Sequence, residues 1–320
     1  MIPEGTLTDT FAADVVRDLQ RTPKQLQARY LYDALGSSLF DAICRLPWYR
    51  ITRAEARLLR RHAPELAAAV PGWLDDPTIV ELGCGNGEKL EVVLTAVPDA
   101  PVDVHLIDIS PDALQAATAR LAGLSHVSVT RHEAPYEVGL DWVRPLLRAR
   151  GPALVLFLGS NIGNFDRPVA ESLLRSIRHA LQPGSALLLG TDLVKPRQTL
   201  ILAYDDPLGV TAAFNKNLLV RINRELGADF DLDAFEHRAI WNETEQRVEM
   251  HLVSLRDQEV WLAAPAVRIR FKAAESIWTE SSYKYTEQSI ADLGARTGFR
   301  VTTQWIDREA AFALTLFESV

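Results

Sequence analysis

The segment 80–90, with the sequence VELGCGNGEKL, constrains the fold of this chain more than any other stretch. It joins the end of a β-branched, apolar run at 78–80 to a segment, 88–97, whose apolar residues recur at helical spacing. Between them, three alternating glycines allow the backbone to turn tightly and to approach a ligand that a Cβ would exclude. We therefore predict a strand, a glycine turn and a helix that together bind a nucleotide cofactor.

The residues around these glycines narrow the type of cofactor. A second strand-like run at 104–108 ends in Asp108, about 20 residues beyond the glycines, where Rossmann-like units hold ribose hydroxyls with a carboxylate. Glu81 followed by Gly-x-Gly-x-Gly resembles the first motif of S-adenosylmethionine (SAM) methyltransferases more than a dehydrogenase fingerprint. Two simpler interpretations stay open: Gly83 and Gly85 could form only a tight turn, and Asp108 could be a solvated acid at a strand end.

Composition excludes several classes of protein and site. The net charge of −8 argues against a nucleic-acid partner, which needs clustered lysine and arginine. The basic cluster at 57–62 lies beside Glu55 and Glu65 in a helical pattern and is predicted to form a solvated helix face. Cys44 and Cys84 are too few for a disulfide framework or a zinc site, and the histidines lack metal-site spacing, so no metal is predicted. Without a membrane-length apolar run or a signal peptide, we expect a cytoplasmic protein with no membrane partner.

The order of the predicted elements indicates an α/β sheet. Strands and helices alternate through the first part of the chain, as in a parallel sheet. The strands are predicted at 78–80, 104–108, 126–130, 153–158 and 186–190, and the helices at 88–97, 112–122, 140–149 and 169–181. The wholly apolar run at 153–158 is predicted to lie in the middle of the sheet.

The alternation stops after residue 192. Two helices and three antiparallel strands follow, predicted at 195–204, 210–226, 236–242, 247–255 and 266–271. The chain then ends with a helix at 289–297 and a hairpin of two strands at 300–306 and 312–318. We interpret the middle segment as an insertion. The closing hairpin favours methyl transfer over hydride transfer, because dehydrogenase sheets do not end in this way.

Helix starts can be predicted from caps near the N-terminus. A short helix is predicted at 11–20. Ser37 or Ser38 is predicted to cap a helix that follows the aromatic residues at 30–32, and Thr52 to cap an amphipathic helix.

The chain resembles the SAM-dependent L-histidine Nα-methyltransferases of ergothioneine biosynthesis over nearly its whole length. The resemblance rests on short motifs, several of them outside the glycine loop. These are LYDALGS (31–37), RLP (45–47) with Tyr49 and Thr52-Arg53, ELG (81–83), FLGSNIGN (157–164), GTDLVK (190–195), YDD (204–206), GVTAAFN (209–215), NREL (223–226), DFDLDAFEH (229–237) and ESS (280–282) with Lys284.

The resemblance implies a fold and a division into domains. The expected fold class is α/β, with a Rossmann-like class I methyltransferase sheet, a closing β-hairpin and an inserted α+β substrate-binding domain. Residues 54–194 with 285–320 are expected to form the SAM-binding methyltransferase domain. Residues 1–53 with 195–284 are expected to form the substrate-binding domain.

The resemblance also implies site residues. Those matching positions that hold SAM are Tyr32, Gly83, Gly85, Lys89, Asp108 and Gly159, with Asp108 on the ribose. Those matching substrate positions are Asn164 and Tyr204 for the amine and carboxylate, Tyr49, Glu280 and Ser282 for the imidazole, and Met250 in the pocket wall. Tyr32 and Phe40 match aromatic residues beside the reacting amine and are the predicted catalytic residues. The chain departs from the family at Arg50-Ile51 and Asn161, and no adenine-binding residue is clear in 131–136.

Each substrate assignment has an ordinary alternative. Asn164 could cap the next helix or tie down a turn, and Tyr204 could be a half-buried surface tyrosine. Glu280 and Ser282 share one face of a strand, where they can bond both nitrogens of an imidazole, but exposed polar residues are common in strands. Met250 is a typical core residue.

The expected reaction is transfer of three methyl groups from SAM to the α-amine of free L-histidine, giving hercynine. Its partners would be histidine and the methylated intermediates, with no nucleic acid, and we expect a monomer. Tyr32 or a neighbouring water is a candidate proton acceptor. Two alternatives remain: the same fold acting on another amino acid such as tryptophan, and a nucleotide-binding domain without turnover.

Overall fold

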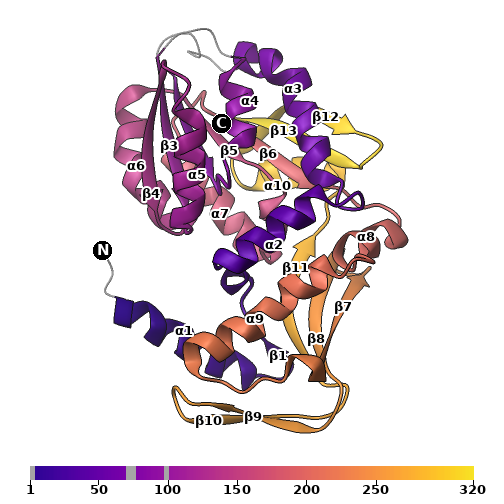
Figure 1. Cartoon of the computed structure of the whole chain (residues 1–320). Helices are drawn as coiled ribbons and strands as arrows, with labels where there is room; N and C mark the ends of the chain where they lie inside the picture. The colour runs from indigo at the N-terminus through magenta and orange to yellow at the C-terminus, as the bar shows by residue number, and fades with distance from the viewer. Residues whose placement is uncertain (1–3, 70–76, 97–100) are drawn as a thin grey trace. The chain divides into compact units, whose positions relative to one another are not determined.

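The computed structural model describes residues 4–69, 77–96 and 101–320, and side chains from 4–9 and 67–69 are left out of the description (Figure 1). The chain divides into two compact units. We call Met1–Tyr49 with Lys195–Ser282 the insert unit, and Arg50–Val194 with Tyr283–Val320 the central-sheet unit.

The central-sheet unit is built on a seven-stranded sheet in the order β12-β13-β6-β5-β2-β3-β4. Its strands are β2 (Thr78–Leu82), β3 (Val102–Asp108), β4 (Val127–Glu133), β5 (Ala153–Phe157), β6 (Ala186–Asp192), β12 (Phe299–Asp307) and β13 (Phe312–Ser319). Strands β2 to β6 are parallel, whereas β13 is antiparallel to both β6 and β12. The prediction of a Rossmann-like methyltransferase sheet with a closing hairpin is confirmed. Strand β5 is the middle strand, as its apolar sequence predicted.

Helices cover both faces of this sheet. Helices α3, α4 and α5 contact one another in turn and pack on β13, β3 and β4, while α6, α7 and α10 form a second layer. Their bounds are α3 (Ile51–Ala69), α4 (Glu88–Leu94), α5 (Pro111–Leu121), α6 (Tyr136–Arg150), α7 (Arg167–Ala180) and α10 (Glu287–Arg296). Val155 and Phe157 of β5 belong to one buried cluster with Leu173 and Ile177 of α7. Burial on both faces explains why the strand is apolar throughout.

The insert unit contains its own sheet, in the order β1-β11-β8-β7, and a separate β9–β10 hairpin. Its elements are α1 (Glu4–Leu19), β1 (Lys24–Gln25), η1 (Ala28–Leu31), α2 (Ala34–Arg45), α8 (Arg197–Tyr204), α9 (Val210–Leu226), η3 (Leu232–Ala234), β7 (Phe235–Asn242), β8 (Arg247–Ser254), β9 (Gln258–Leu262), β10 (Val267–Phe271) and β11 (Ser276–Tyr283). Helices α8 and α9 pack on β7 and β8, and α9 also packs on α2 (Figure 1).

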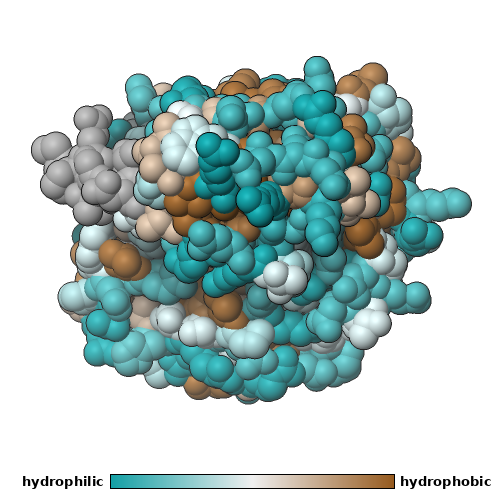
Figure 2. Space-filling view, turned by 90° about the horizontal axis from the view of Figure 1, so that it is seen from below, coloured by the Kyte–Doolittle hydropathy of each residue, from teal (hydrophilic) through white to brown (hydrophobic). Residues whose placement is uncertain are grey.

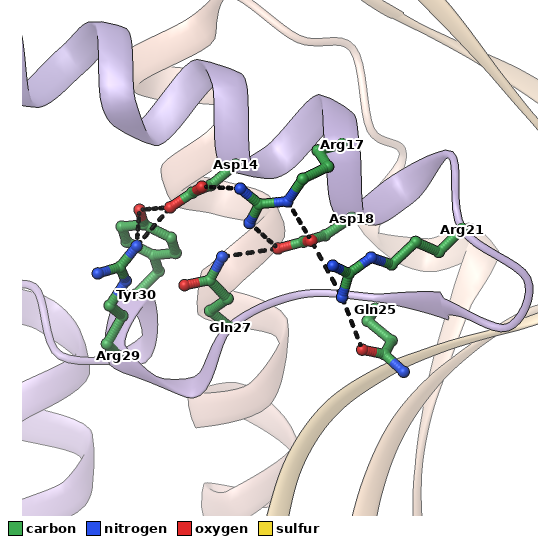
Figure 3. A network of polar contacts seen from close by, with 8 residues as sticks. All are labelled: Asp14, Arg17, Asp18, Arg21, Gln25, Gln27, Arg29 and Tyr30. Atoms are coloured by element: carbon green, nitrogen blue, oxygen red, sulfur yellow. Dashed lines mark hydrogen bonds and ion pairs between the residues drawn. The ribbon is translucent and has the colours of Figure 1, made fainter. Parts of the chain in front are cut away.

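Polar side chains hold the first helix of the insert unit in place (Figure 3). Asp14 of α1 accepts a hydrogen bond from the Tyr30 hydroxyl at 2.7 Å and forms ion pairs with Arg17 and Arg29. Asp18 accepts a hydrogen bond from Gln27 at 2.7 Å. Both acids are buried. Burial of α1 side chains against the following segment explains why this helix is ordered although its sequence pattern is weak.

The structure corrects two of the predicted caps. Helix α2 begins at Ala34, and its cap is Asp33, which accepts a hydrogen bond from the Gly36 N–H at 2.8 Å. Ser37 and Ser38 therefore lie inside the helix, because the carboxylate of Asp33 already binds the free N–H groups of the first turn. Thr52 is also not a cap: α3 begins at Ile51, and the Arg50 carbonyl accepts from the Ala54 N–H.

Other differences concern element limits and one pairing. Helix α1 begins before residue 11. Helix α6 begins at Tyr136 and not at residue 140 as predicted. Its first turn carries the exposed Val138, which obscured the apolar pattern there. Helix α4 ends at Leu94, and the last residue of the helix predicted at 88–97 lies outside the described residues. The strand predicted at 266–271 pairs with β9, which was not predicted, and not with β7 or β8. Strand β9 is short and begins with polar residues, so its sequence alternates weakly.

The surface drawn in Figure 2 is mostly hydrophilic, with hydrophobic residues interspersed in small groups. Among the described residues, no helix combines the length and the apolar character that crossing a membrane requires.

Candidate active site

The glycine loop between β2 and α4 has the backbone that its sequence predicted. Gly83, Gly85 and Gly87 have φ angles of 74°, 52° and 77°, in the left-handed region that favours glycine. A Cβ on Gly83 would lie 2.7 Å from the Tyr136 hydroxyl and 2.8 Å from Nδ2 of Asn161. A Cβ on Gly85 would meet nothing within 4 Å. The loop is thus tightly packed at its first glycine and open at its second.

Asp108 lies beside this loop at the carboxyl end of β3. Strand β3 pairs with β2 up to Leu82 and Ile107, and the Gly83 N–H donates to the Ile107 carbonyl. One carboxylate oxygen of Asp108 accepts from the Ser110 N–H at 2.9 Å. Burial raises the pKa of Asp108, while hydrogen bonds from backbone N–H groups, including that of Gly85, oppose the rise. The structure therefore places the predicted ribose carboxylate next to the open part of the glycine loop.

Glu55 of α3 connects two further predicted cofactor residues. The Lys89 ammonium lies 2.5 Å from Oε2 of Glu55, and the Gly159 N–H donates to both carboxylate oxygens at 2.8 and 2.9 Å. Glu55 is 0% exposed, whereas Arg57, Arg60 and Arg61 of the following basic cluster are exposed, as predicted for a solvated helix face. A carboxylate that pairs with a lysine and an N–H group can be buried, which a sequence pattern for one helix cannot reveal.

The turn that carries Asn164 packs on one side against Tyr283, the last residue of β11. Gly163 lies so close to this segment that a Cβ there would be 2.8 Å from the Tyr283 carbonyl oxygen. Ser160 at the start of the turn has a φ of 59°, and its hydroxyl accepts from the Asp192 N–H at 2.9 Å. Asn164 itself is exposed, and the cap of α7 is Asp166. Asn164 therefore does not cap the next helix.

Five of the predicted substrate and catalytic residues form a continuous row of contacts within the insert unit. Ring centroids lie 5.5 Å apart for Tyr32 and Phe40, 6.2 Å for Phe40 and Tyr49, and 6.2 Å for Tyr49 and Tyr204. The Tyr204 hydroxyl donates to Oγ of Ser282 at 2.8 Å. These residues come from three distant parts of the sequence, so the fold brings the predicted residues together.

Phe214 of α9 completes this aromatic row and was missed by the sequence analysis. Its ring lies 5.5 Å from that of Tyr32 and 5.9 Å from that of Phe40, and the residue is buried. An apolar residue inside a helix pattern is usually core, so its only signal was its place in the GVTAAFN motif.

Tyr204 ends α8 and is fixed by a buried histidine. Nε2 of His237 lies 2.8 Å from the Tyr204 carbonyl oxygen, and Nδ1 lies 2.9 Å from Nδ2 of Asn215. Burial lowers the pKa of His237, which favours a neutral ring that donates from Nε2 and accepts at Nδ1. Tyr204 is itself buried, unlike an ordinary surface tyrosine. His237 thus positions a candidate substrate residue, a role that the sequence analysis did not assign to it.

The remaining candidates lie on β8 and β11. Glu280 is 9% exposed and Ser282 is 5% exposed, so neither is an ordinary solvent-facing polar residue of a strand. Met250 is 2% exposed, and its carbonyl accepts from the Thr279 hydroxyl at 2.9 Å. Among the residues that the structure describes, no group of three or more His, Cys, Asp or Glu side chains could hold a metal ion.

A family model described as histidine-specific methyltransferase, SAM-dependent, matches residues 11–319. The chain belongs to this family. A "Histidine N-alpha-methyltransferase" of Mycolicibacterium smegmatis is 42% identical over 311 residues, which cover 96% of this chain and 94% of that protein. A protein of the same name from Mycobacterium tuberculosis is 40% identical, covering 95% and 93% of the two chains. "Ergothioneine biosynthesis protein 1" of Schizosaccharomyces pombe is 30% identical, but the match covers only 40% of its length.

The residues of this histidine-specific methyltransferase fit the SAM that the family uses. The open position at Gly85 leaves room for a ligand that a Cβ would exclude, and the Asp108 carboxylate can accept hydrogen bonds from ribose hydroxyls. Lys89 and Gly159 lie together at the carboxyl ends of neighbouring parallel strands, where open α/β sheets bind their ligands. SAM is the cofactor of the family, and the loop geometry suits it.

Proposed function

We propose that the protein transfers three methyl groups from SAM to the α-amine of L-histidine, giving hercynine and three molecules of S-adenosylhomocysteine. Membership of the family and the names of the two mycobacterial relatives support this assignment. The structural observation that carries it is the row from the half-buried Tyr32 to the buried Ser282, which combines aromatic rings with polar groups. We assign SAM binding to the glycine-loop and strand-end residues of the central-sheet unit together with Tyr32, and recognition of the amino acid to residues of the insert unit together with Asn164.

The proposed reaction is a direct displacement. SAM supplies a methyl group already activated by its positive sulfonium, so the protein needs neither a metal nor a covalent intermediate. Its contribution is to align the amine lone pair with the bond that breaks and to accept the amine in its neutral form. Tyr32 is the side chain that we assign as proton acceptor, directly or through a water.

Asn164 and Tyr204 are assigned to the amino and carboxylate groups of the substrate. An amide and a phenol can donate to a carboxylate and accept from an amine without adding charge. Neutral partners leave the amine free to lose its proton, which a carboxylate partner would oppose.

Glu280 and Ser282 are assigned to the imidazole. The two residues are buried near the end of β11, where a carboxylate can accept from one ring N–H and a hydroxyl can bond the other nitrogen. A substrate side chain without a ring N–H would not supply the hydrogen bond that the imidazole gives to the buried Glu280 carboxylate, at a cost of roughly 1–3 kcal/mol. This pair is therefore the proposed source of preference for histidine.

Phe40 and Tyr32 are assigned to the methylated amine. As methyl groups accumulate, the nitrogen becomes a fixed cation, and an aromatic face can stabilise it by roughly 0.5–2 kcal/mol. The edge-to-face packing of the two rings at 5.5 Å holds both near one position.

Mass spectrometry of histidine, SAM and the protein tests the proposal directly. We expect additions of one, two and three methyl groups to histidine, ending in hercynine. Preferential methylation of tryptophan or another amino acid in the same assay would support the alternative substrate class. SAM binding without methylation of any amino acid would support a non-catalytic domain.

A further inference from the structure

Two buried carboxylates compete for one lysine beside the glycine loop. Glu55 of α3 is 0% exposed, and Glu81 at the carboxyl end of β2 is 2% exposed. Lys89 of α4 is paired with Glu55 at 2.5 Å. Oε2 of Glu81 is buried and has no hydrogen-bond partner in the described part of the chain. A buried carboxylate oxygen without a partner is costly unless the group is neutral or a ligand completes it.

The contacts around the Glu55 side chain keep its carboxylate beside Lys89. Both of its oxygens accept from the Gly159 N–H at 2.8 and 2.9 Å, and any Cβ at Gly190 would overlap Oε1 of Glu55. The carboxylate thus lies between the end of β5, strand β6 and helix α4, with little room to move. This arrangement holds the Lys89 ammonium and the Gly159 N–H in fixed positions, and both belong to predicted SAM residues.

The charges around Glu81 are mostly of its own sign. Burial raises the pKa of Glu81 to about 8; Lys89 opposes the rise, and Glu55 and Asp108 add to it. Cys84 and Tyr136 also lie within its electrostatic reach, and burial raises the pKa of each of these groups, with the charge of Glu81 adding to it. Both are therefore neutral near pH 7. The site as a whole has three carboxyl groups and one lysine, which suits a cationic ligand.

We propose that Glu55 is a positioning residue of the SAM site, which fixes Lys89 and Gly159 and so leaves Glu81 as a protonated carboxyl group that ionises when SAM binds. In this step the O–H bond of Glu81 breaks, the proton passes to the solvent, and the carboxylate pairs with the positive charge of SAM. The inference rests on SAM binding, which is one part of the proposed function, and does not depend on the amino-acid substrate.

Calorimetry of SAM binding in buffers of different ionisation enthalpy measures the protons released. At pH 7 we expect the wild-type protein to release close to one proton per SAM, because Glu81 is mainly protonated below pH 8. The release should fall toward zero well above that pH. Below it, the affinity for SAM should weaken by up to about tenfold for each pH unit, because one proton must leave for each ligand bound.

Three variants separate positioning from general structural support. Glu55→Gln keeps the volume but frees Lys89 to pair with Glu81, so Glu81 is already ionised and proton release should fall to near zero. Glu81→Gln should also abolish the release. Glu91→Gln is the matched control, because Glu91 lies on the same helix as Lys89 but pairs with Arg120 at the surface, at 3.1 Å. It should release as many protons as the wild type.

The outcomes that overturn the inference are distinct from failure of the proposed function. SAM binding to the wild type without proton release, or full release by the folded Glu55→Gln variant, would overturn the inference alone. A wild-type protein that does not bind SAM at all would overturn the inference together with the proposed function. If Glu55→Gln does not fold, the pH profile of the wild type and the Glu81→Gln variant still test whether Glu81 ionises when SAM binds.

Discussion

The residues assigned to SAM and those assigned to the amino acid are built in different ways. Apart from Tyr32, the SAM residues lie at or just beyond the carboxyl ends of parallel strands in the central sheet. Most of their geometry is in the backbone, with three glycines in left-handed conformations. The amino-acid residues of the insert unit are buried or half-buried side chains from α2 and the segments on either side of it, and from α8, β8 and β11.

This difference determines which kind of substitution disrupts each site. A backbone-built site is broken by any side chain that fills the turn, whatever its chemistry. A site built from side chains instead loses one interaction at a time, and its selectivity depends on which polar group is left without a partner. The following variants test this contrast.

The largest effect is expected for Gly83→Val. A side chain at this position would combine a left-handed backbone with close contact to Tyr136 and Asn161, so SAM affinity should fall by at least about 100-fold, or roughly 3 kcal/mol. Calorimetry with SAM measures the loss. Gly209→Ala is the control: Gly209 has a similar left-handed φ of 72°, its Cβ would meet nothing within 4 Å, and it is not assigned to SAM, so only a backbone cost of about 1 kcal/mol in stability applies. Equal effects of the two substitutions would contradict the role given to the packed first glycine.

Glu280→Ala should change substrate preference. Loss of the carboxylate removes a partner of the imidazole, and kcat/KM for histidine should fall by about 5- to 150-fold, corresponding to roughly 1–3 kcal/mol. Activity on tryptophan should be unchanged or higher. Competition between the two amino acids with labelled SAM measures the ratio. Ser281→Ala, at the neighbouring half-buried residue of the same strand, should leave the ratio unaltered. An unchanged preference in Glu280→Ala would refute the assignment.

Phe40→Leu should slow the last methylation more than the first. Leucine keeps an apolar side chain but removes the aromatic face, so about 0.5–2 kcal/mol of stabilisation of the cationic nitrogen is lost, or roughly 2- to 30-fold in rate. A time course by mass spectrometry should reveal accumulation of dimethylhistidine. Identical slowing of all three steps would point instead to a general packing role for Phe40.

The smallest effect concerns the cap of α2, which anchors the aromatic segment. Asp33→Ala should lower the free energy of unfolding by about 1–2 kcal/mol at pH 7, measured by urea denaturation. Burial acts to raise the pKa of Asp33, but hydrogen bonds from Arg224, the Gly36 N–H and Asn217 outweigh it, so the folded-state pKa lies below its ordinary value. The contribution is therefore present above about pH 4 and is lost as the pH falls through the lower folded-state pKa.

Ser110→Ala is the control for this pH dependence. Ser110 caps α5 and accepts from the Ala113 N–H at 3.2 Å, but its hydroxyl does not titrate in this range. Its loss should cost a similar free energy of unfolding at pH 7 and at pH 4. If Asp33→Ala, like Ser110→Ala, lowers the free energy of unfolding by the same amount at pH 7 and at pH 4, the charge of Asp33 contributes little.

Much of the central-sheet unit could be predicted from the sequence, because its signals are local. The apolar strand at 153–157, the glycine loop and the closing hairpin each depend on residues close together in the chain. The strand order could not be predicted, because the sequence of a strand does not specify which other strand it pairs with. The site residues, apart from those of the loop and Asp108, were predicted from family motifs and not from periodicity.

The contributions of Glu55, Phe214 and His237 were decided only by tertiary structure. Each occupies a position that, within its own element, is typical of a solvated acid, a core aromatic or an ordinary histidine. Their roles come from partners far away in the sequence: Gly159, Tyr32 and Tyr204. The sequence by itself determined where strands end and the backbone must turn, because these depend on steric limits of neighbouring residues. Which buried charge meets which partner was decided by the fold, because burial and pairing are properties of the assembled chain.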